Sequence, residues 1–204
     1  MRHTIFNLIL LTSIALAQSK MEVVVEPEAR VTKRVMFIID VSGSMTNDNR
    51  IPVAIRKMQE ITNQPIDDYE FAVIVFSDNI ERWEGLPDED TPKGWAKLPS
   101  VEAISNAQKF VSCGRDHDGT DFAPPLIAAL SEPRKDLTLV LITDGIFDHA
   151  YHEAPFILNT ISSLQQWREK SGLGRAVIYA IELEHKDWLK QLVKLGDGGL
   201  FYSE

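Results

Sequence analysis

The most constraining feature of this sequence is an apolar run that ends abruptly in a carboxylate and two hydroxyls. Residues 35–39 are all Val, Met, Phe or Ile, and the segment from Asp40 to Ser44 reads Asp-Val-Ser-Gly-Ser. A continuous apolar run of this length is typical of a parallel strand buried on both faces. In open α/β sheets, ligands bind outside the carboxyl ends of such strands. We therefore expect a buried strand whose carboxyl end opens into a ligand-binding loop.

The expected loop is rich in oxygen donors. Asp40, Ser42 and Ser44 supply one carboxylate and two hydroxyls at alternate positions, and Gly43 is expected to let the backbone turn tightly between them. Hard oxygen donors of this kind suit Mg²⁺, with Mn²⁺ as a possible substitute. The loop alone therefore indicates a candidate site for a divalent cation.

Apolar runs alternate with helical patterns along the rest of the chain. Strands are expected over 33–40, 69–76, 137–142 and 175–182, with a short last strand at 199–202. Helices are expected over 51–61, 101–111, 122–130, 156–170 and 185–195. Ser100 is expected to cap the second of them, and Pro124 and Pro125 suit the first turn of the third. Residues 80–99 predict a short edge strand and then a surface loop. Such alternation favours parallel pairing through right-handed crossovers.

The first residues differ in character from the rest. Arg2 is followed by a largely apolar segment over 5–17 that ends in Ala-Leu-Ala, the pattern of a signal peptide with its cleavage site. The alternative, a hydrophobic anchor, would need about 20 apolar residues to span a bilayer. We expect a signal peptide over 1–17, a tether over 18–32 and one domain over 33–204. This layout favours a secreted or periplasmic protein without a membrane anchor, and a bacterial origin.

Composition narrows the class of partner. With 204 residues, of which 44% are hydrophobic and 25% charged, the chain is suited to one globular domain. Its formal net charge of -9 argues against nucleic-acid binding, because acidic surfaces repel phosphate backbones. Cys113 is the only cysteine, so an intramolecular disulfide is impossible.

Two further segments extend the candidate site. Gly119-Thr120-Asp121 precedes an expected helix, and Thr143-Asp144-Gly145 follows an expected strand. Together with the Asp-x-Ser-x-Ser loop, and in this order, they resemble the metal-ion-dependent adhesion site of the von Willebrand factor type A domain. The resemblance covers residues 33–202. It implies a doubly wound α/β sheet, mostly parallel with one antiparallel edge strand near residues 81–83, and with helices on both faces.

The resemblance also implies roles for individual residues. Ser42, Ser44 and Thr120 match the hydroxyl ligands of the family, and Asp40 and Asp144 match the carboxylates that bind the ion directly or through water. In the family, an acidic side chain of a partner protein completes the metal shell. The rim that would select this partner includes Asp116, His117, Asp118 and Asp148. Asp121 is expected to cap a helix or support a ligand.

Other interpretations of these residues remain open. Asp40 and Asp144 would also suit helix caps, and residues 116–118 would suit a solvated acidic loop. His149 and His152 have a spacing that suits zinc, although Pro155 disturbs the start of the expected helix. A metal-dependent hydrolase could use the same ion with His117 or His149 as base, but the chain has no Gly-x-Ser-x-Gly elbow or phosphate-binding loop. A non-enzymatic binding module is therefore favoured, with a metal-free structural module as a further alternative.

Overall fold

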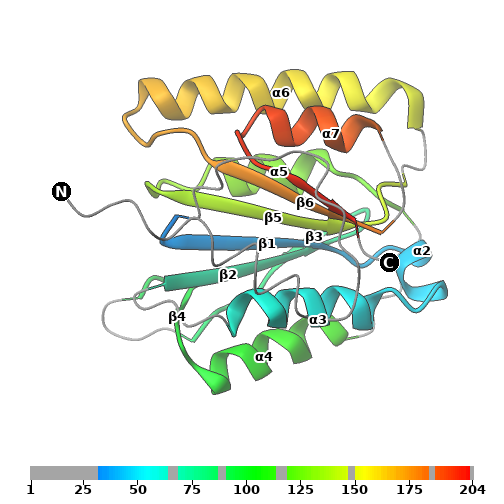
Figure 1. Ribbon diagram of the computed structural model, residues 1–204, viewed down its shortest axis with the longest axis vertical. Helices are drawn as coiled ribbons and strands as arrows, with labels where there is room; N and C mark the ends of the chain where they lie inside the picture. The colour runs from blue at the N-terminus through cyan, green and yellow to red at the C-terminus, as the bar shows by residue number, and fades with distance from the viewer. Residues whose placement is uncertain are drawn as a thin grey trace.

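The computed structural model describes residues 32–63, 69–86, 91–113, 119–146, 150–183 and 187–202. These residues form a central sheet with helices on both faces (Figure 1). The strands are β1 (Arg34–Asp40), β2 (Tyr69–Phe76), β3 (Ile80–Arg82), β4 (Ala96–Leu98), β5 (Leu137–Thr143), β6 (Val177–Glu182) and β7 (Leu200–Tyr202). The helices are α2 (Gly43–Asn47), α3 (Ile51–Thr62), α4 (Val101–Ser112), α5 (Ala123–Leu130), α6 (Ala150–Lys170) and α7 (Asp187–Lys194). The predicted signal peptide and residues 18–31 of the tether lie outside this part of the chain.

The sheet has the order β3-β2-β1-β5-β6-β7. β1 pairs in parallel with β2 on one side and with β5 on the other, and β5, β6 and β7 continue the parallel arrangement. The carboxyl ends of these strands therefore meet at one edge of the molecule, beside α2 (Figure 1). The doubly wound, mostly parallel fold predicted from the sequence is confirmed.

Alternate side chains of β1 build two separate cores. Met36 and Ile38 point to the face covered by α5, α6 and α7, whereas Phe37 and Ile39 point to the face covered by α3 and α4. All four side chains are fully buried. Because successive side chains of a strand point to opposite faces, only a strand covered on both faces needs a continuous apolar sequence. The apolar run is thus explained by the central position of β1.

Both edges of the sheet are covered by short segments. β3 pairs antiparallel with residues 74–76 of β2, and β4 pairs antiparallel with residues 69–71 of the same strand. The predicted edge strand near residues 81–83 is confirmed as β3, but β4 falls where we expected a surface loop. At the other edge, β7 pairs with Ala180–Glu182 of β6, and the backbone N–H of Ile178 donates to the carbonyl of Gly196 at 3.4 Å.

Local sequence signals account for the starts of α4 and α5. The Ser100 hydroxyl accepts the backbone N–H of Ala103 at 3.1 Å, so the predicted cap of α4 is confirmed. The two prolines predicted for the first turn of α5 lie there. The prediction for α6 was wrong at its start, because the helix begins at Ala150 and continues through Pro155. Pro155 is the sixth residue of α6, where a proline removes one backbone hydrogen bond and crowds the carbonyl four residues back, and the helix continues in spite of this cost.

A buried arginine joins α6 to the rest of its layer. Arg168 is fully buried, and its guanidinium donates to the carbonyls of Leu130, Glu132, Arg134 and Gly174 at 2.7 to 3.2 Å. These carbonyls belong to the last residue of α5, to the segment between α5 and β5 and to the segment before β6. The guanidinium therefore supplies hydrogen-bond donors to backbone carbonyls that are not paired within a helix or the sheet.

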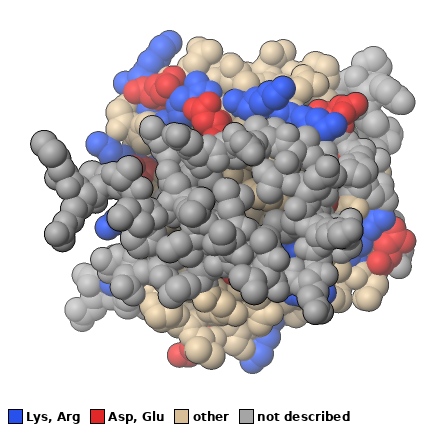
Figure 2. All heavy atoms as spheres, viewed as in Figure 1, with Lys and Arg blue, Asp and Glu red and all other residues tan. Residues whose placement is uncertain are grey.

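The outer surface over α6 and α7 is charged with both signs. Figure 2 shows Lys and Arg side chains interspersed with Asp and Glu along this side of the molecule. No helix within the described ranges is both long enough and apolar enough to span a membrane.

Candidate metal site at the carboxyl ends of the strands

Two buried carboxylates lie at the ends of neighbouring strands. Asp40 is the last residue of β1, and Asp144 directly follows β5, its parallel neighbour. Both side chains are 0% exposed. Buried carboxylates need partners, because the loss of hydration strongly disfavours the ionised form. The contacts of these two residues therefore indicate what the site can hold.

Asp40 is held by hydrogen bonds on both oxygens. The backbone N–H of Ser42 donates to Oδ1 at 2.9 Å, and the Thr143 hydroxyl donates to Oδ2 at 2.7 Å. The same Thr143 oxygen accepts the backbone N–H of Gly145 at 2.8 Å. Thr143 thus joins the loop that follows Asp40 to the loop that carries Asp144, and it fixes the rotamer of Asp40. Sequence reasoning did not assign this role, although Thr143 occupies the last position of β5.

Burial raises the pKa of Asp40 to about 6. Hydrogen bonds from Ser42 and Thr143 oppose this rise, whereas the negative charge of Asp144 adds to it. The two carboxylates are therefore close enough to repel each other. A positive charge between or beside them would relieve both the desolvation and the repulsion.

The two serine hydroxyls lie beside this pair. The Oγ atoms of Ser42 and Ser44 are 3.3 Å apart, and Ser42 is buried whereas Ser44 is partly exposed. Our prediction of a tight glycine turn between them was wrong, because Gly43 is the first residue of α2. Ser42 is the N-cap of α2 and has extended backbone, with φ of -61° and ψ of 170°, so its hydroxyl lies near that of Ser44 where the chain enters the helix. The sharp turn after Asp144 is made by Gly145, with φ of 69°.

Thr120 belongs to the same edge of the sheet. Its neighbour Asp121 donates its backbone N–H to the carbonyl of Ser77 at 2.8 Å, and Ser77 directly follows β2. Because β2 pairs with β1, this bond fixes the loop of Thr120 near the end of β1. The Asp121 carboxylate accepts the backbone N–H of Ala123, the first residue of α5, at 3.0 Å, while the N-cap position itself is Phe122.

A chain of aromatic rings packs against two of the motif loops, those of Thr120 and Asp144, and reaches the end of β2. The rings of Phe76 and Phe122 meet edge to face with centroids 5.1 Å apart, and those of Phe122 and Trp188 do so at 4.9 Å. Phe76 ends β2, Phe122 follows Thr120 by two residues, and the indole N–H of Trp188 donates to the carbonyl of Gly145 at 3.2 Å. The loops therefore share one packed, apolar base.

An arginine that sequence reasoning missed contacts the carboxylate pair. Arg50 Nη1 lies 2.7 Å from Asp144 Oδ2, and the other oxygen of Asp144 accepts the backbone N–H of Ile146 at 3.1 Å. No sequence pattern indicated this contact, because Arg50 and Asp144 are 94 residues apart.

Several predicted residues lie outside the described part of the chain. These are the rim residues Asp116, His117, Asp118 and Asp148, together with His149, and the side chain of His152 is not described either. Within the described ranges, no group of three or more His, Cys, Asp or Glu side chains could hold a metal ion. The motif ligands form no such group, since only Asp40 and Asp144 among them are carboxylates.

Comparison with known proteins assigns the family. A family model described as the von Willebrand factor type A domain matches residues 35–146, more than half of the chain. The chain belongs to the von Willebrand factor type A family. Domains of this family are typically protein-interaction modules. A search of curated protein sequences found no significant match.

Solved structures of the same fold come from varied sources. The ArnB paralog VWA2 from Sulfolobus acidocaldarius is 14% identical with a TM-score of 0.52 over 90% of this chain, and proximal thread matrix protein 1 from the mussel byssus is 19% identical with the same TM-score and coverage. The pilus adhesin SpaC from Lactobacillus rhamnosus GG, in an open conformation, is 14% identical with a TM-score of 0.51 over 76% of the chain. The chain spans 42%, 44% and 24% of these proteins, respectively. At such identities, the likeness concerns the fold alone.

Proposed function

We propose that this von Willebrand factor type A domain is a secreted or periplasmic binding module that captures an acidic side chain of a partner protein through a divalent cation. Asp40, Ser42, Ser44, Thr120 and Asp144 would hold the ion, Mg²⁺ or Mn²⁺. The signal-peptide pattern over residues 1–17 supports export, and the family supports protein interaction.

One observation carries the proposal. Two fully buried carboxylates come from neighbouring strand ends, and the charge of one raises the pKa of the other. Hydroxyls 3.3 Å apart lie beside them, so the donor set is hard and oxygen-rich. This chemistry fits a small divalent cation.

Each residue contributes in a definite way. Asp40 and Asp144 would balance the two positive charges, and the neutral hydroxyls of Ser42, Ser44 and Thr120 would add ligands without further negative charge. When bound, the ion would supply a Lewis-acidic position for an incoming carboxylate. Thr143 and the aromatic base would keep the ligand loops in place, so little ordering would be needed on binding.

A hydrolase on the same site would also need a general base. The candidates for that base, His117 and His149, lie outside the described residues. The protein-interaction character of the family therefore favours the binding function.

Thermal unfolding with EDTA, Mg²⁺ or Mn²⁺ tests the metal site. At about 100 times its dissociation constant, the ion should stabilise the fold by about 2.7 kcal/mol, which raises Tm by roughly 5 to 10 °C in a domain of this size. Asp40→Ala and Ser44→Ala should lose this rise, whereas Ser105→Ala, on the exposed face of α4, should retain it. An unchanged wild-type Tm in millimolar Mg²⁺ and Mn²⁺ would argue against the site.

Peptide selection tests the partner chemistry. Peptides selected on the protein in Mg²⁺ should contain an Asp or Glu whose change to Asn or Gln abolishes binding. Binding should also be lost in EDTA and in Ser44→Ala. Selected peptides that bind equally well in EDTA would contradict capture through an ion.

A further inference from the structure

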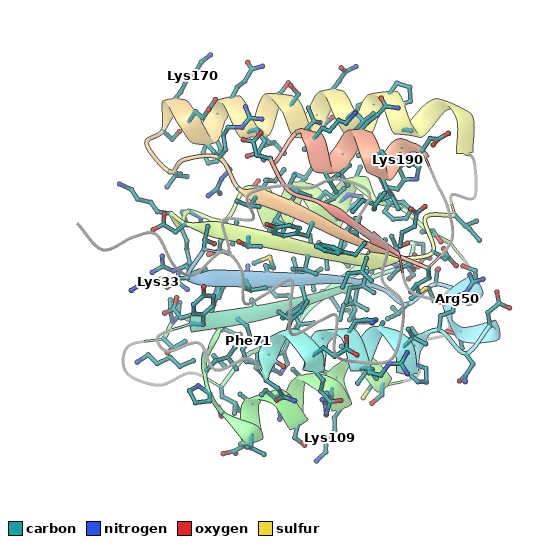
Figure 3. The ribbon with its side chains drawn as sticks, viewed as in Figure 1. Lys33, Arg50, Phe71, Lys109, Lys170 and Lys190 are labelled. Carbon is teal, nitrogen blue, oxygen red and sulfur yellow. The ribbon has the colours of Figure 1, made fainter. Side chains whose placement is uncertain are left out.

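Arg50 places a positive charge directly on the proposed metal site. Its Nη1 lies 2.7 Å from Asp144 Oδ2, and its Nη2 lies 2.9 Å from Asp48 Oδ2. Asp144 is 0% exposed, Arg50 is 17% exposed and Asp48 is 57% exposed. The guanidinium thus bridges a buried acid of the site and an exposed acid outside it. Figure 3 shows Arg50 at the end of the sheet beside α2, opposite the end labelled by Lys33.

Backbone hydrogen bonds on both sides of Arg50 hold the main chain from which its side chain extends. Arg50 directly precedes α3, and its carbonyl accepts the backbone N–H of Ala54 at 3.0 Å. Its own N–H donates to the carbonyl of Met45 in α2 at 2.8 Å. Because α2 also carries Ser44, the arginine and a predicted hydroxyl ligand belong to one rigid unit.

Arg50 already supplies the positive charge that the buried carboxylate of Asp144 needs, and a bound cation would supply the same charge. A charged carboxylate without exposure requires a counter-charge, and the planar fork of an arginine is well suited to supply it. A divalent ion held by Asp144 would lie within a few ångströms of the same guanidinium. Since like charges at that distance repel strongly in a partly buried site, the ion and the guanidinium cannot share Asp144 without cost.

We propose that Arg50 is an internal competitor of the divalent cation for Asp144. When the cation binds, the guanidinium leaves Asp144 and keeps its second partner, Asp48, at the rim. Arg50 thereby stabilises the metal-free protein and lowers the affinity for the ion. This inference rests on the proposed metal site and adds the residue that sets its affinity.

Titration calorimetry with Mn²⁺ on the full chain tests the competition. Arg50→Gln should bind Mn²⁺ about 10-fold more tightly than the wild type, because a repelling charge is removed. In EDTA, the same variant should have a lower Tm, since Asp144 loses its counter-charge. The matched control is Arg56→Gln on α3, whose side chain is 56% exposed and 3.9 Å from Glu60. It should change neither quantity.

Asp48 provides a second, opposite test. Asp48→Asn weakens the pull of the rim on Arg50, so the guanidinium should stay on Asp144 more of the time and Mn²⁺ should bind more weakly. In the Arg50→Gln background, the Asp48→Asn change should have little further effect on affinity. Non-additivity of this kind would show that Asp48 acts through Arg50 and not as a distant negative charge.

The outcomes separate the inference from the proposed function. If the wild type binds Mn²⁺ but Arg50→Gln binds it equally or more weakly, Arg50 positions Asp144 and does not compete, and the inference fails alone. If neither protein binds Mn²⁺, both the metal site and the inference fail. Should Arg50→Gln not fold, Arg50→Lys keeps a charge without the planar fork and should have an affinity above that of the wild type.

Discussion

At the scale of single residues, Asp40 is the side chain whose ionisation the structure most clearly opposes. It is fully buried, and its pKa is raised from 3.8 to about 6 by burial and by the charge of Asp144. In the absence of a cation, the folded protein therefore binds a proton at Asp40 more tightly than the unfolded chain does. A group with a raised carboxyl pKa favours the fold at low pH and loses that contribution as the pH rises through its folded pKa.

The stability of the metal-free protein should therefore contain a component that declines between about pH 4 and pH 7. A rise in pKa from 3.8 to about 6 corresponds to about 3 kcal/mol. Asp40→Asn should lack this component and should gain stability relative to the wild type as the pH rises. Urea unfolding in EDTA at pH 4, 5.5 and 7 measures the difference. Parallel pH curves for the two proteins would show that Asp40 does not titrate in this way.

Residue spacing predicted part of the site and missed the rest for a physical reason. Asp40 and Asp144 could be placed at strand ends because Asp40 directly follows an apolar run and Asp144 is separated from one by Thr143 alone. The contacts of Arg50 and Thr143 depend on side-chain directions across elements that are distant in sequence. Whether all five predicted ligands bind an ion stays a prediction.

At the scale of elements, α7 is tied to the site by one side chain. Trp188 packs against Phe122 with ring centroids 4.9 Å apart and donates its indole N–H to Gly145. Gly145 directly follows Asp144. A displacement of α7 would therefore alter the loop that carries a predicted ligand.

Trp188→Phe tests this connection. The phenyl ring can keep the aromatic contact but cannot donate to Gly145, so a buried carbonyl loses its partner at a cost of about 1 to 3 kcal/mol. Urea unfolding should show this loss, whereas Trp167→Phe, at a site 45% exposed on α6, should cost far less. Equal effects of the two changes would mean that the bond to Gly145 contributes little.

Element prediction succeeded where local chemistry decides and failed where tertiary packing decides. Ser100 and the prolines of α5 mark their helices by contacts within a few residues. β4 has only three residues and exists because it pairs with β2. The start of α6 was misplaced because Pro155 was expected to disturb the helix, yet the helix tolerates it.

At the scale of the whole molecule, Arg168 fixes the position of α6 against its layer. It donates to carbonyls of Leu130, Glu132, Arg134 and Gly174, on two separate segments. A helix held in this way cannot slide along the sheet without breaking several of these hydrogen bonds. Rearrangement on binding would then fall to elements other than α6.

Arg168→Gln should destabilise the protein by about 3 kcal/mol or more, because one buried and three partly buried hydrogen bonds to carbonyls lose their charged donor together. Lys170→Gln, an exposed change on the same helix, should stay within about 0.5 kcal/mol of the wild type. Chemical denaturation of both variants measures the contrast. A small effect of Arg168→Gln would mean that water replaces the guanidinium at these carbonyls.

The covered edges of the sheet limit how another protein can attach. Many binding domains accept an extended peptide as an additional strand, whose backbone pairs with an open sheet edge. Here β3 and β4 occupy the edge of β2, while β7 and the carbonyl of Gly196 occupy the edge of β6. Since each of these outermost strands has only three residues, an incoming strand could pair with only a short stretch of backbone along the described edges. Recognition should therefore depend on side chains at the loop end of the sheet, and a partner's backbone should contribute little to the affinity.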